Sequence, residues 1–155
     1  MNLPLHLQRR RALLAGAALW PFTTQAAPAL RSFELDSLPH IHAGPRPYVL
    51  TLWGLNCAPC VQVLRELARW RSRLRIVTVA VDSIDDSDAL LHELAQARLT
   101  SEAWVFGRAA PEALRHAIDP QWSGEKPRHY LVAENGTRRV VSGFLKPEYL
   151  QALVQ

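Results

Sequence analysis

Two cysteines, Cys57 and Cys60, are the only thiols in the 155-residue chain, and two residues separate them. Thiols at this spacing can close a disulfide with each other and exchange it with a disulfide in another protein. A helix is expected to begin at the pair, where unpaired N–H groups and the helix dipole stabilise a thiolate. The spacing therefore predicts a redox-active pair in which Cys57 is the nucleophile and Cys60, one turn further in, resolves the mixed disulfide.

The residues around the pair predict a strand that leads into a helix. Residues 48–53 form an apolar, β-branched run typical of a buried strand, and residues 54–56 interrupt it. Residues 61–70 carry apolar side chains at spacings of three and four, so we expect a helix over 58–73. Pro59 fits its first turn because an N–H there would lack a partner.

Two other uses of the cysteine pair remain open. A structural disulfide would gain only roughly 2 kcal/mol from closing so short a ring, against about 4.7 kcal/mol for a hundred-residue loop. A metal site would need further ligands, yet the chain has no other cysteine and its closest histidine pair is His40 and His42. Covalent haem attachment is excluded because Val61, not histidine, follows Cys60.

The rest of the chain predicts a single domain with a sheet of mixed direction. Residues 28–47 contain four prolines and are predicted to be irregular apart from a short edge strand at 32–35. Asn135-Gly136 between two β-branched runs is a strong hairpin signal. The other predicted elements are strands at 74–81, 104–106, 129–133 and 137–142, and helices at 89–99, 111–118 and from Pro147 onward. This order predicts an α/β fold with a central mixed β-sheet flanked by helices on both faces.

The first 26 residues are predicted to be a signal peptide, followed by one domain over 27–155. Three arginines at 9–11 precede an apolar run at 12–20 and a small-residue stretch that ends at Ala26. The arginines also fit a twin-arginine signal, and cleavage after Ala29 is the alternative. The apolar run is about half the ~20 residues needed to span a bilayer, which disfavours an uncleaved anchor. We therefore expect a periplasmic protein, in a compartment where dithiols tend to be oxidised.

The charge of the chain disfavours nucleic acid as a partner. The net charge is +4, but residues 9–11 supply three of the 18 basic side chains, and the first thirty residues contain no Asp or Glu. The remainder has 15 basic and 14 acidic side chains, so it offers no basic patch of the size that nucleic acid needs.

With these elements in place, the chain resembles the thioredoxin-like superfamily, and within it the exported TlpA-type thiol–disulfide oxidoreductases. The resemblance rests on Trp53 four residues before Cys57, the Cys-x-Pro-Cys motif, the order of elements and a Gly-x-x-Pro segment before a strand at 124–132. It covers about residues 33–154. It implies that Trp53 packs beside the cysteines and that Pro127 is a cis-proline facing them, where it shapes a groove for an extended client segment. Lys126, beside Pro127, is either a solvated surface lysine or a charge that favours the thiolate of Cys57, and both interpretations stay open.

Three positions depart from the pattern of that family. The place of a buried Asp, six residues before the first cysteine, holds Thr51, so this position supplies no carboxylate to accept the Cys60 proton. Arg128 replaces the usual Thr after the cis-proline, and Lys126 replaces a small or β-branched residue before it. These departures affect the expected redox potential more than the expected fold.

The predicted function is that of an exported protein-disulfide oxidoreductase that reduces disulfides of client proteins and needs no cofactor. Pro59 before the second cysteine matches the reducing members of the family, and the resemblance suggests clients in cytochrome c or copper-oxidase maturation. A reductase in this compartment must be recharged, which implies a DsbD-like membrane electron donor. Two alternatives stay open: an oxidant that introduces disulfides, and a copper-binding module that joins the cysteine pair to His40, His42 or His129.

Overall fold

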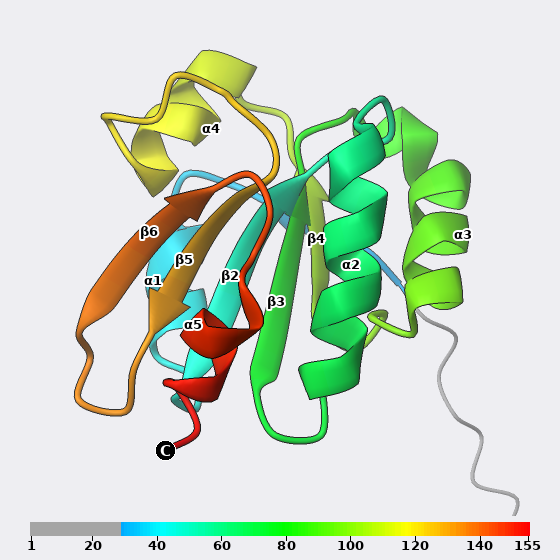
Figure 1. The fold of residues 1–155 in the computed structure, drawn as a ribbon. Helices are drawn as coiled ribbons and strands as arrows, with labels where there is room; N and C mark the ends of the chain where they lie inside the picture. Colours follow the sequence, from blue (N-terminus) through cyan, green and yellow to red (C-terminus); the bar gives the residue numbers. More distant parts are fainter. Residues whose placement is uncertain (1–28) are drawn as a thin grey trace, which may run out of the picture.

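The protein is built on a six-stranded sheet with the strand order β1-β4-β3-β2-β5-β6 (Figure 1). The computed structural model describes residues 29–155, so the predicted signal peptide lies outside the described residues. The strands are β1 (Arg31–Phe33), β2 (Tyr48–Trp53), β3 (Arg75–Ala80), β4 (Ala103–Phe106), β5 (Arg128–Val132) and β6 (Arg138–Ser142). The helices are α1 (Ser37–His42), α2 (Ala58–Trp70), α3 (Ser87–Ala97), α4 (Pro111–Ile118) and α5 (Pro147–Gln151), with a 3-10 turn, η1 (Ile84–Asp86), before α3. Within residues 29–155, no helix is both long and apolar enough to cross a membrane.

The central strand β2 is parallel to β3 on one side and antiparallel to β5 on the other. The pairs β3–β4 and β4–β1 are also parallel, whereas β5 and β6 form the antiparallel hairpin predicted at Asn135-Gly136. The predicted mixed sheet is therefore confirmed. All six residues of β2 are buried because helices cover both of its faces.

Two apolar cores lie on the two faces of the sheet. The helices α2, α3 and α5 cover one face, and its core contains both cysteines together with Val49, Trp53 and Leu131. The helices α1 and α4 cover the other face, whose core contains Leu50, Leu52 and Tyr130. Successive side chains of a strand point to opposite faces, so Val49 and Trp53 of β2 point to the α2 face, and Leu50 and Leu52 point to the other. The cysteines, at the start of α2, share the first of these cores.

The structure differs from the prediction in one additional helix and in the bounds of several elements. The interpretation of residues 28–47 as irregular is wrong at Ser37–His42, which form α1. Pro39 is tolerated there because it lies in the first turn, where its missing N–H would have no partner. The helix α2 ends at Trp70 rather than at 73, since the N–H groups of residues 73 and 74 both bond to the Trp70 carbonyl at 2.8 Å. The helix α3 begins and ends two residues earlier than predicted, and it stops where Arg98 adopts a left-handed backbone with φ 57°.

Candidate active site

The cysteine pair lies at the start of α2. Cys57 is the N-cap residue, Cys60 is the third residue of the helix, and their sulfur atoms form a disulfide. Cys57 is 9% exposed and Cys60 is fully buried. Pro59 lies between them in the first turn, and the Cys60 N–H bonds to the Cys57 carbonyl at 2.9 Å. Cys57 is thus slightly exposed to solvent and Cys60 is not, an order of exposure that suits a nucleophile and a resolving thiol.

Trp53 packs in the same core as the cysteines. It is the last residue of β2 and is fully buried. Its indole N–H has no hydrogen-bond partner within residues 29–155. The structure thus places Trp53 in the same apolar core as the cysteines, and its role in the site stays a prediction.

Pro127 comes to the same end of β2 as the disulfide. Because β5 runs antiparallel to β2 and Arg128 lies opposite Leu52, the residue before Arg128 reaches the end of β2. The Lys126–Pro127 peptide bond is cis, as the resemblance implied. The Pro127 carbonyl accepts the Gly143 N–H at 2.8 Å, which ties this loop to the segment after β6.

Lys126 and Asp82 approach the loop in front of Cys57. A Cβ atom on Gly54 would lie 2.6 Å from the Lys126 Nζ atom and 2.9 Å from an Asp82 carboxylate oxygen. The same Asp82 oxygen accepts the Leu55 N–H at 3.2 Å. The absence of a side chain at Gly54 therefore leaves room for one cation and one anion, and Asp82 offsets part of the charge that Lys126 brings there.

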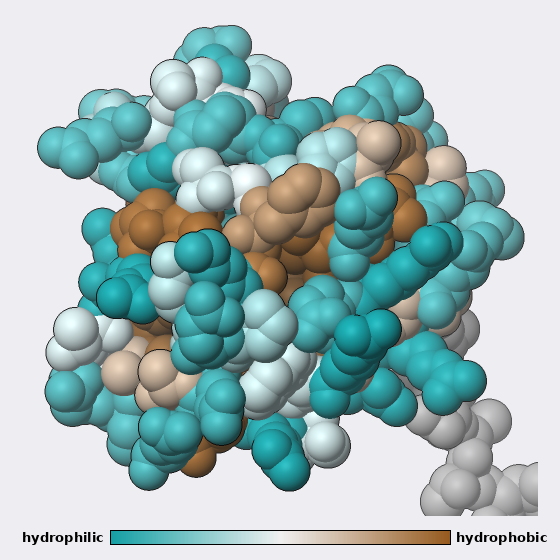
Figure 2. Space-filling view, viewed as in Figure 1, coloured by the Kyte–Doolittle hydropathy of each residue, from teal (hydrophilic) through white to brown (hydrophobic). Residues whose placement is uncertain are grey.

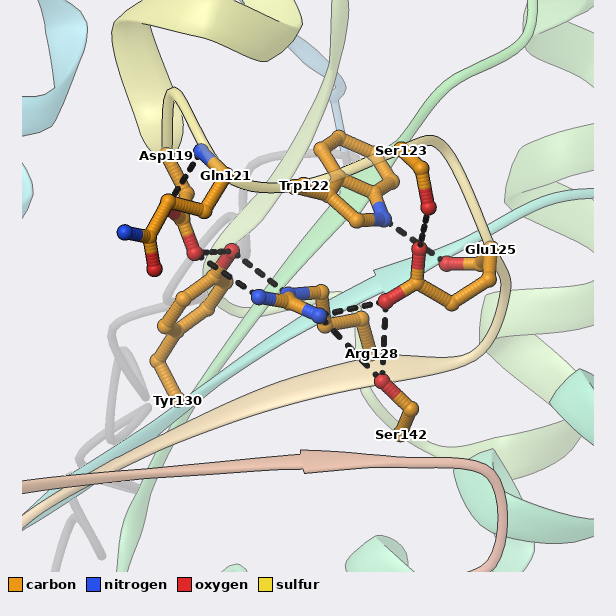
Figure 3. Close-up of polar contacts among 8 residues, drawn as sticks. All are labelled: Asp119, Gln121, Trp122, Ser123, Glu125, Arg128, Tyr130 and Ser142. Atoms are coloured by element: carbon orange, nitrogen blue, oxygen red, sulfur yellow. Dashed lines mark hydrogen bonds and ion pairs between the residues drawn. The ribbon is translucent and has the colours of Figure 1, made fainter.

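A network of polar side chains anchors the loop that carries Lys126 and Pro127 (Figure 3). Its centre is Arg128, whose guanidinium donates hydrogen bonds to Asp119 at 2.8 Å and to the Tyr130 hydroxyl at 2.9 Å. The same guanidinium contacts Glu125 on its other side. Further bonds from Ser123, Ser142 and the Trp122 indole to residue 125 complete the network. The loop between α4 and β5 is therefore held by side chains from both of its ends.

The charges in this network stabilise one another. Burial alone would raise the pKa of Asp119, but hydrogen bonds from Arg128, Gln121 and Tyr130 outweigh it and hold the pKa below its usual value. Burial raises the pKa of Tyr130 to about 12. Sequence analysis had identified Arg128 only as a departure from a family pattern. Glu125 is a local partner, three residues before Arg128, whereas Asp119 lies nine residues away at the end of α4, and no sequence pattern pairs it with Arg128.

A second polar pair lies on the α2 face, and sequence analysis missed it. His129 is fully buried, with Nε2 2.9 Å from the Gly143 carbonyl oxygen and Nδ1 3.1 Å from the Thr51 hydroxyl oxygen. A carbonyl can only accept, so Nε2 carries the hydrogen and Nδ1 accepts the Thr51 hydroxyl. Burial lowers the pKa of His129 to about 4, so the ring is neutral at pH 7. The sequence marks Thr51 as unusual, because it stands where the family has a buried Asp. It does not identify His129 as the partner, since the two residues are 78 positions apart.

Two of the candidate copper ligands, His40 and His42, are not brought to the cysteine pair. His42 contacts the Tyr48 hydroxyl at the start of β2, the opposite end from the cysteines. Burial, together with the positive charge of Arg138, lowers the pKa of His42. His40 is exposed on α1. In the part of the chain that the structure describes, no three His, Cys, Asp or Glu side chains are grouped so that they could hold a metal ion.

Exposed apolar side chains flank the disulfide end of the sheet. Figure 2 shows a band of apolar residues, in brown, across the upper part of one face, over the end of β6 and the first turns of α2. Phe144, after β6, is 60% exposed, and Ile84, after β3, is 43% exposed. Phe144 follows Gly143, whose N–H donates to the Pro127 carbonyl, so Phe144 lies close in the chain to the segment that is tied to the cis-proline loop.

Comparisons with known proteins identify structures of similar architecture. No protein-family model and no curated protein sequence matches the chain. A secreted disulfide oxidoreductase from Mycobacterium tuberculosis, homologous to DsbE of E. coli, matches with a TM-score of 0.52 at 18% identity, over 70% of this chain and 80% of that one. A thiol:disulfide interchange protein of the thioredoxin family from Chlorobium tepidum matches with a TM-score of 0.57 at 16% identity, over 83% and 95%. StoA from Bacillus subtilis matches with a TM-score of 0.52 at 15% identity, over 84% and 100%. Together with the mixed sheet and the disulfide at the start of α2, these similarities show that the chain has the thioredoxin-like fold.

Proposed function

We propose that this protein is an exported thiol–disulfide oxidoreductase that reduces disulfides in client proteins. The observation that carries the proposal is the contrast within one disulfide: Cys57 is 9% exposed, whereas Cys60 is fully buried. A client sulfur can reach Cys57 from solvent, and Cys60 can then reach the mixed disulfide only from inside the protein. The descriptions of the similar structures as a disulfide oxidoreductase and a thiol:disulfide interchange protein support the same chemistry.

In the reducing direction, the Cys57 thiolate attacks one sulfur of the client disulfide, and the other client sulfur leaves as a thiolate. Cys60 then attacks the Cys57 sulfur, which closes the disulfide and releases the second client sulfur. The client gains two electrons and the cysteine pair loses two. The pair must then be reduced again, and we propose a DsbD-like membrane protein as the donor. A signal peptide over residues 1–26 would place the protein in the periplasm.

The client would bind across the loop that carries Pro127. An extended client segment can lie against this loop by main-chain contacts, while its apolar side chains contact the exposed Phe144. Lys126 and Asp82, on either side of Gly54, would border the same surface and influence the thiolate of Cys57.

Trapping of the mixed disulfide tests the roles of the two cysteines. We expect Cys60→Ser to accumulate a covalent complex with a disulfide-containing client, because only Cys60 can release it. Cys57→Ser should trap none, since the buried thiol is out of reach. Equal trapping by both variants, or by neither, would refute the proposed exchange reaction.

The direction of electron flow is tested by the equilibrium potential of the Cys57–Cys60 pair against glutathione. We expect a value between those of thioredoxin, about −270 mV, and protein disulfide isomerase, about −180 mV. A value near that of the oxidant DsbA, about −120 mV, would show that the protein oxidises its clients. In that case the exchange chemistry would stand and the reductase direction would be wrong.

A further inference from the structure

Three polar side chains form a row across the α2 face of the sheet. Thr78 of β3 is the register partner of Thr51 in β2, and Thr51 is the register partner of His129 in β5. All three are fully buried. Thr51 lies between Val49 and Trp53 on its strand, and these two residues pack in one core with the cysteines. The alternation of a strand therefore points the row toward the same core as the disulfide.

Burial of these three polar side chains in an otherwise apolar core costs folding free energy. Thr51 and His129 satisfy each other, but the Thr78 hydroxyl has no hydrogen-bond partner within residues 29–155. A buried polar group without a partner costs free energy that an apolar side chain of the same shape would not. Polar groups retained at such a cost beside a reactive centre are candidates for a role in its chemistry.

The proposed reaction needs a proton acceptor in this core. Cys60 is fully buried, and its sulfur attacks only as a thiolate, so the Cys60 thiol must lose its proton inside the protein. Among the described residues, Asp119 is the buried carboxylate, and it is paired with Arg128 on the opposite face. We propose that His129 accepts the Cys60 proton at Nδ1 by way of the Thr51 hydroxyl, which already donates to that atom. This inference deepens the proposed function and rests on it.

The step balances without any other reactant. The Thr51 hydroxyl passes its proton to His129 Nδ1 and takes the proton of the Cys60 thiol. The electron pair left on the Cys60 sulfur forms the bond to the Cys57 sulfur, and the client sulfur leaves with the electron pair of the broken bond. The imidazolium Nδ1–H then donates to Thr51, whose own hydroxyl can turn to the free Thr78 oxygen. The proton finally passes from His129 to solvent or to the departing client thiolate.

The electrostatics of the site allow His129 to respond to the redox state. Burial is the main reason for its low pKa, the Gly143 carbonyl opposes it, and no charged side chain contributes. The apolar cluster on this face includes the cysteines from α2 and Tyr149 from α5, whose side chains can titrate. Reduction converts the uncharged disulfide into groups that can carry negative charge. A thiolate in this core favours the imidazolium, so the pKa of His129 should be higher in the dithiol form than in the disulfide form.

Single-turnover kinetics test the assignment. Reduced protein is mixed with a large excess of oxidised glutathione, so that attack by Cys60 on the mixed disulfide becomes rate-limiting. With wild-type protein we expect this rate to change little between pH 5.5 and pH 8. In His129→Leu it should fall roughly a hundredfold at pH 7, the lower end of what a positioned base contributes. It should also rise about tenfold per pH unit, because deprotonation then depends on solvent. The matched control is His116→Gln, an exposed histidine on α4, which should behave as wild type.

Titration of the wild-type His129 ring by NMR gives an independent readout if His129→Leu does not fold. The inference predicts a higher pKa for His129 in the dithiol form than the value of about 4 in the disulfide form. An unchanged pKa, or identical pH profiles for wild type and His129→Leu, would overturn the inference and leave the proposed function intact. If the reduced wild-type protein does not react with glutathione disulfide, both proposals fall.

Discussion

Polar side chains on the two faces of β5 have opposite surroundings: they form ion pairs on one face and neutral hydrogen bonds on the other. Arg128 and Tyr130 point to the α4 side, where ion pairs and hydrogen bonds with Asp119 and Glu125 hold them in charged or strongly paired states. His129, between them in the sequence, points to the α2 side, where it is neutral and makes two hydrogen bonds. A fixed charge stabilises geometry, whereas a neutral titratable group can still take up a proton. The fold therefore separates the network that anchors the cis-proline loop from the polar row beside the cysteines.

Removal of the charge on the α4 side should have the largest effect on stability. Arg128→Leu leaves the Asp119 carboxylate buried without its cation, and breaking such a pair costs about 3 kcal/mol or more of unfolding free energy. Chemical denaturation measures this loss. Arg65→Leu, at an exposed position on α2, is the control and should change stability by less than about 0.5 kcal/mol. A loss in Arg128→Leu as small as in the control would mean that the network does not anchor the loop.

Because His129 is neutral and buried on the α2 side, the free energy of unfolding should decrease as the pH falls below about 6.5. The pKa of His129 is about 4 in the folded protein against 6.5 for the free side chain, so the unfolded chain takes up the proton first as pH falls. Stability from this group is complete above pH 6.5 and lost progressively toward pH 4, by roughly 3 kcal/mol.

Unfolding free energies measured at pH 7 and pH 4 for wild type and His129→Leu isolate this contribution. The wild-type protein should lose roughly 3 kcal/mol more than the variant over that interval. If the two proteins lose the same amount, His129 is not held neutral by burial, and the contrast between the two faces of β5 disappears.

The smallest expected effect is at Lys126, where the anchored loop meets the redox site. A positive charge near Cys57 stabilises its thiolate and so raises the reduction potential. Asp82 lies beside the same glycine and offsets part of this charge. A single charge at the surface is worth about 1 kcal/mol at 4 Å in water, which corresponds to roughly 20 mV.

Lys126→Thr should therefore lower the potential of the pair by roughly 20 mV, measured against glutathione. Asp82→Asn should shift it in the opposite direction, because Asp82 then no longer offsets the lysine. A rise in potential in Lys126→Thr would show that the lysine does not act on the thiolate through its charge.

Several elements could be predicted because their signals are local. The bounds of β2 and α4 agree with the prediction: an apolar and β-branched run marks the first, and Pro111 in a first turn marks the second. The four prolines of residues 28–47 predict an irregular segment, but Pro39 falls in the first turn of α1, where no N–H is needed, and so does not prevent the helix. The cis bond before Pro127 was predicted from a resemblance and not from any physical property of the residues around it.

The disulfide of this protein, and the exchange chemistry proposed for it, depend on residues that are neighbours in the chain. Cys57, Pro59 and Cys60 meet at the start of a helix, and the start of a helix is a local property of the backbone. The proposed proton transfer depends instead on the order of strands. β2 lies between β3 and β5, and their register sets Thr78, Thr51 and His129 in one row although His129 is 78 residues from Thr51. The low pKa of His129 arises mainly from burial, which exists only once the helices close over this face of the sheet. No stretch of sequence contains that burial, because distant segments create it together.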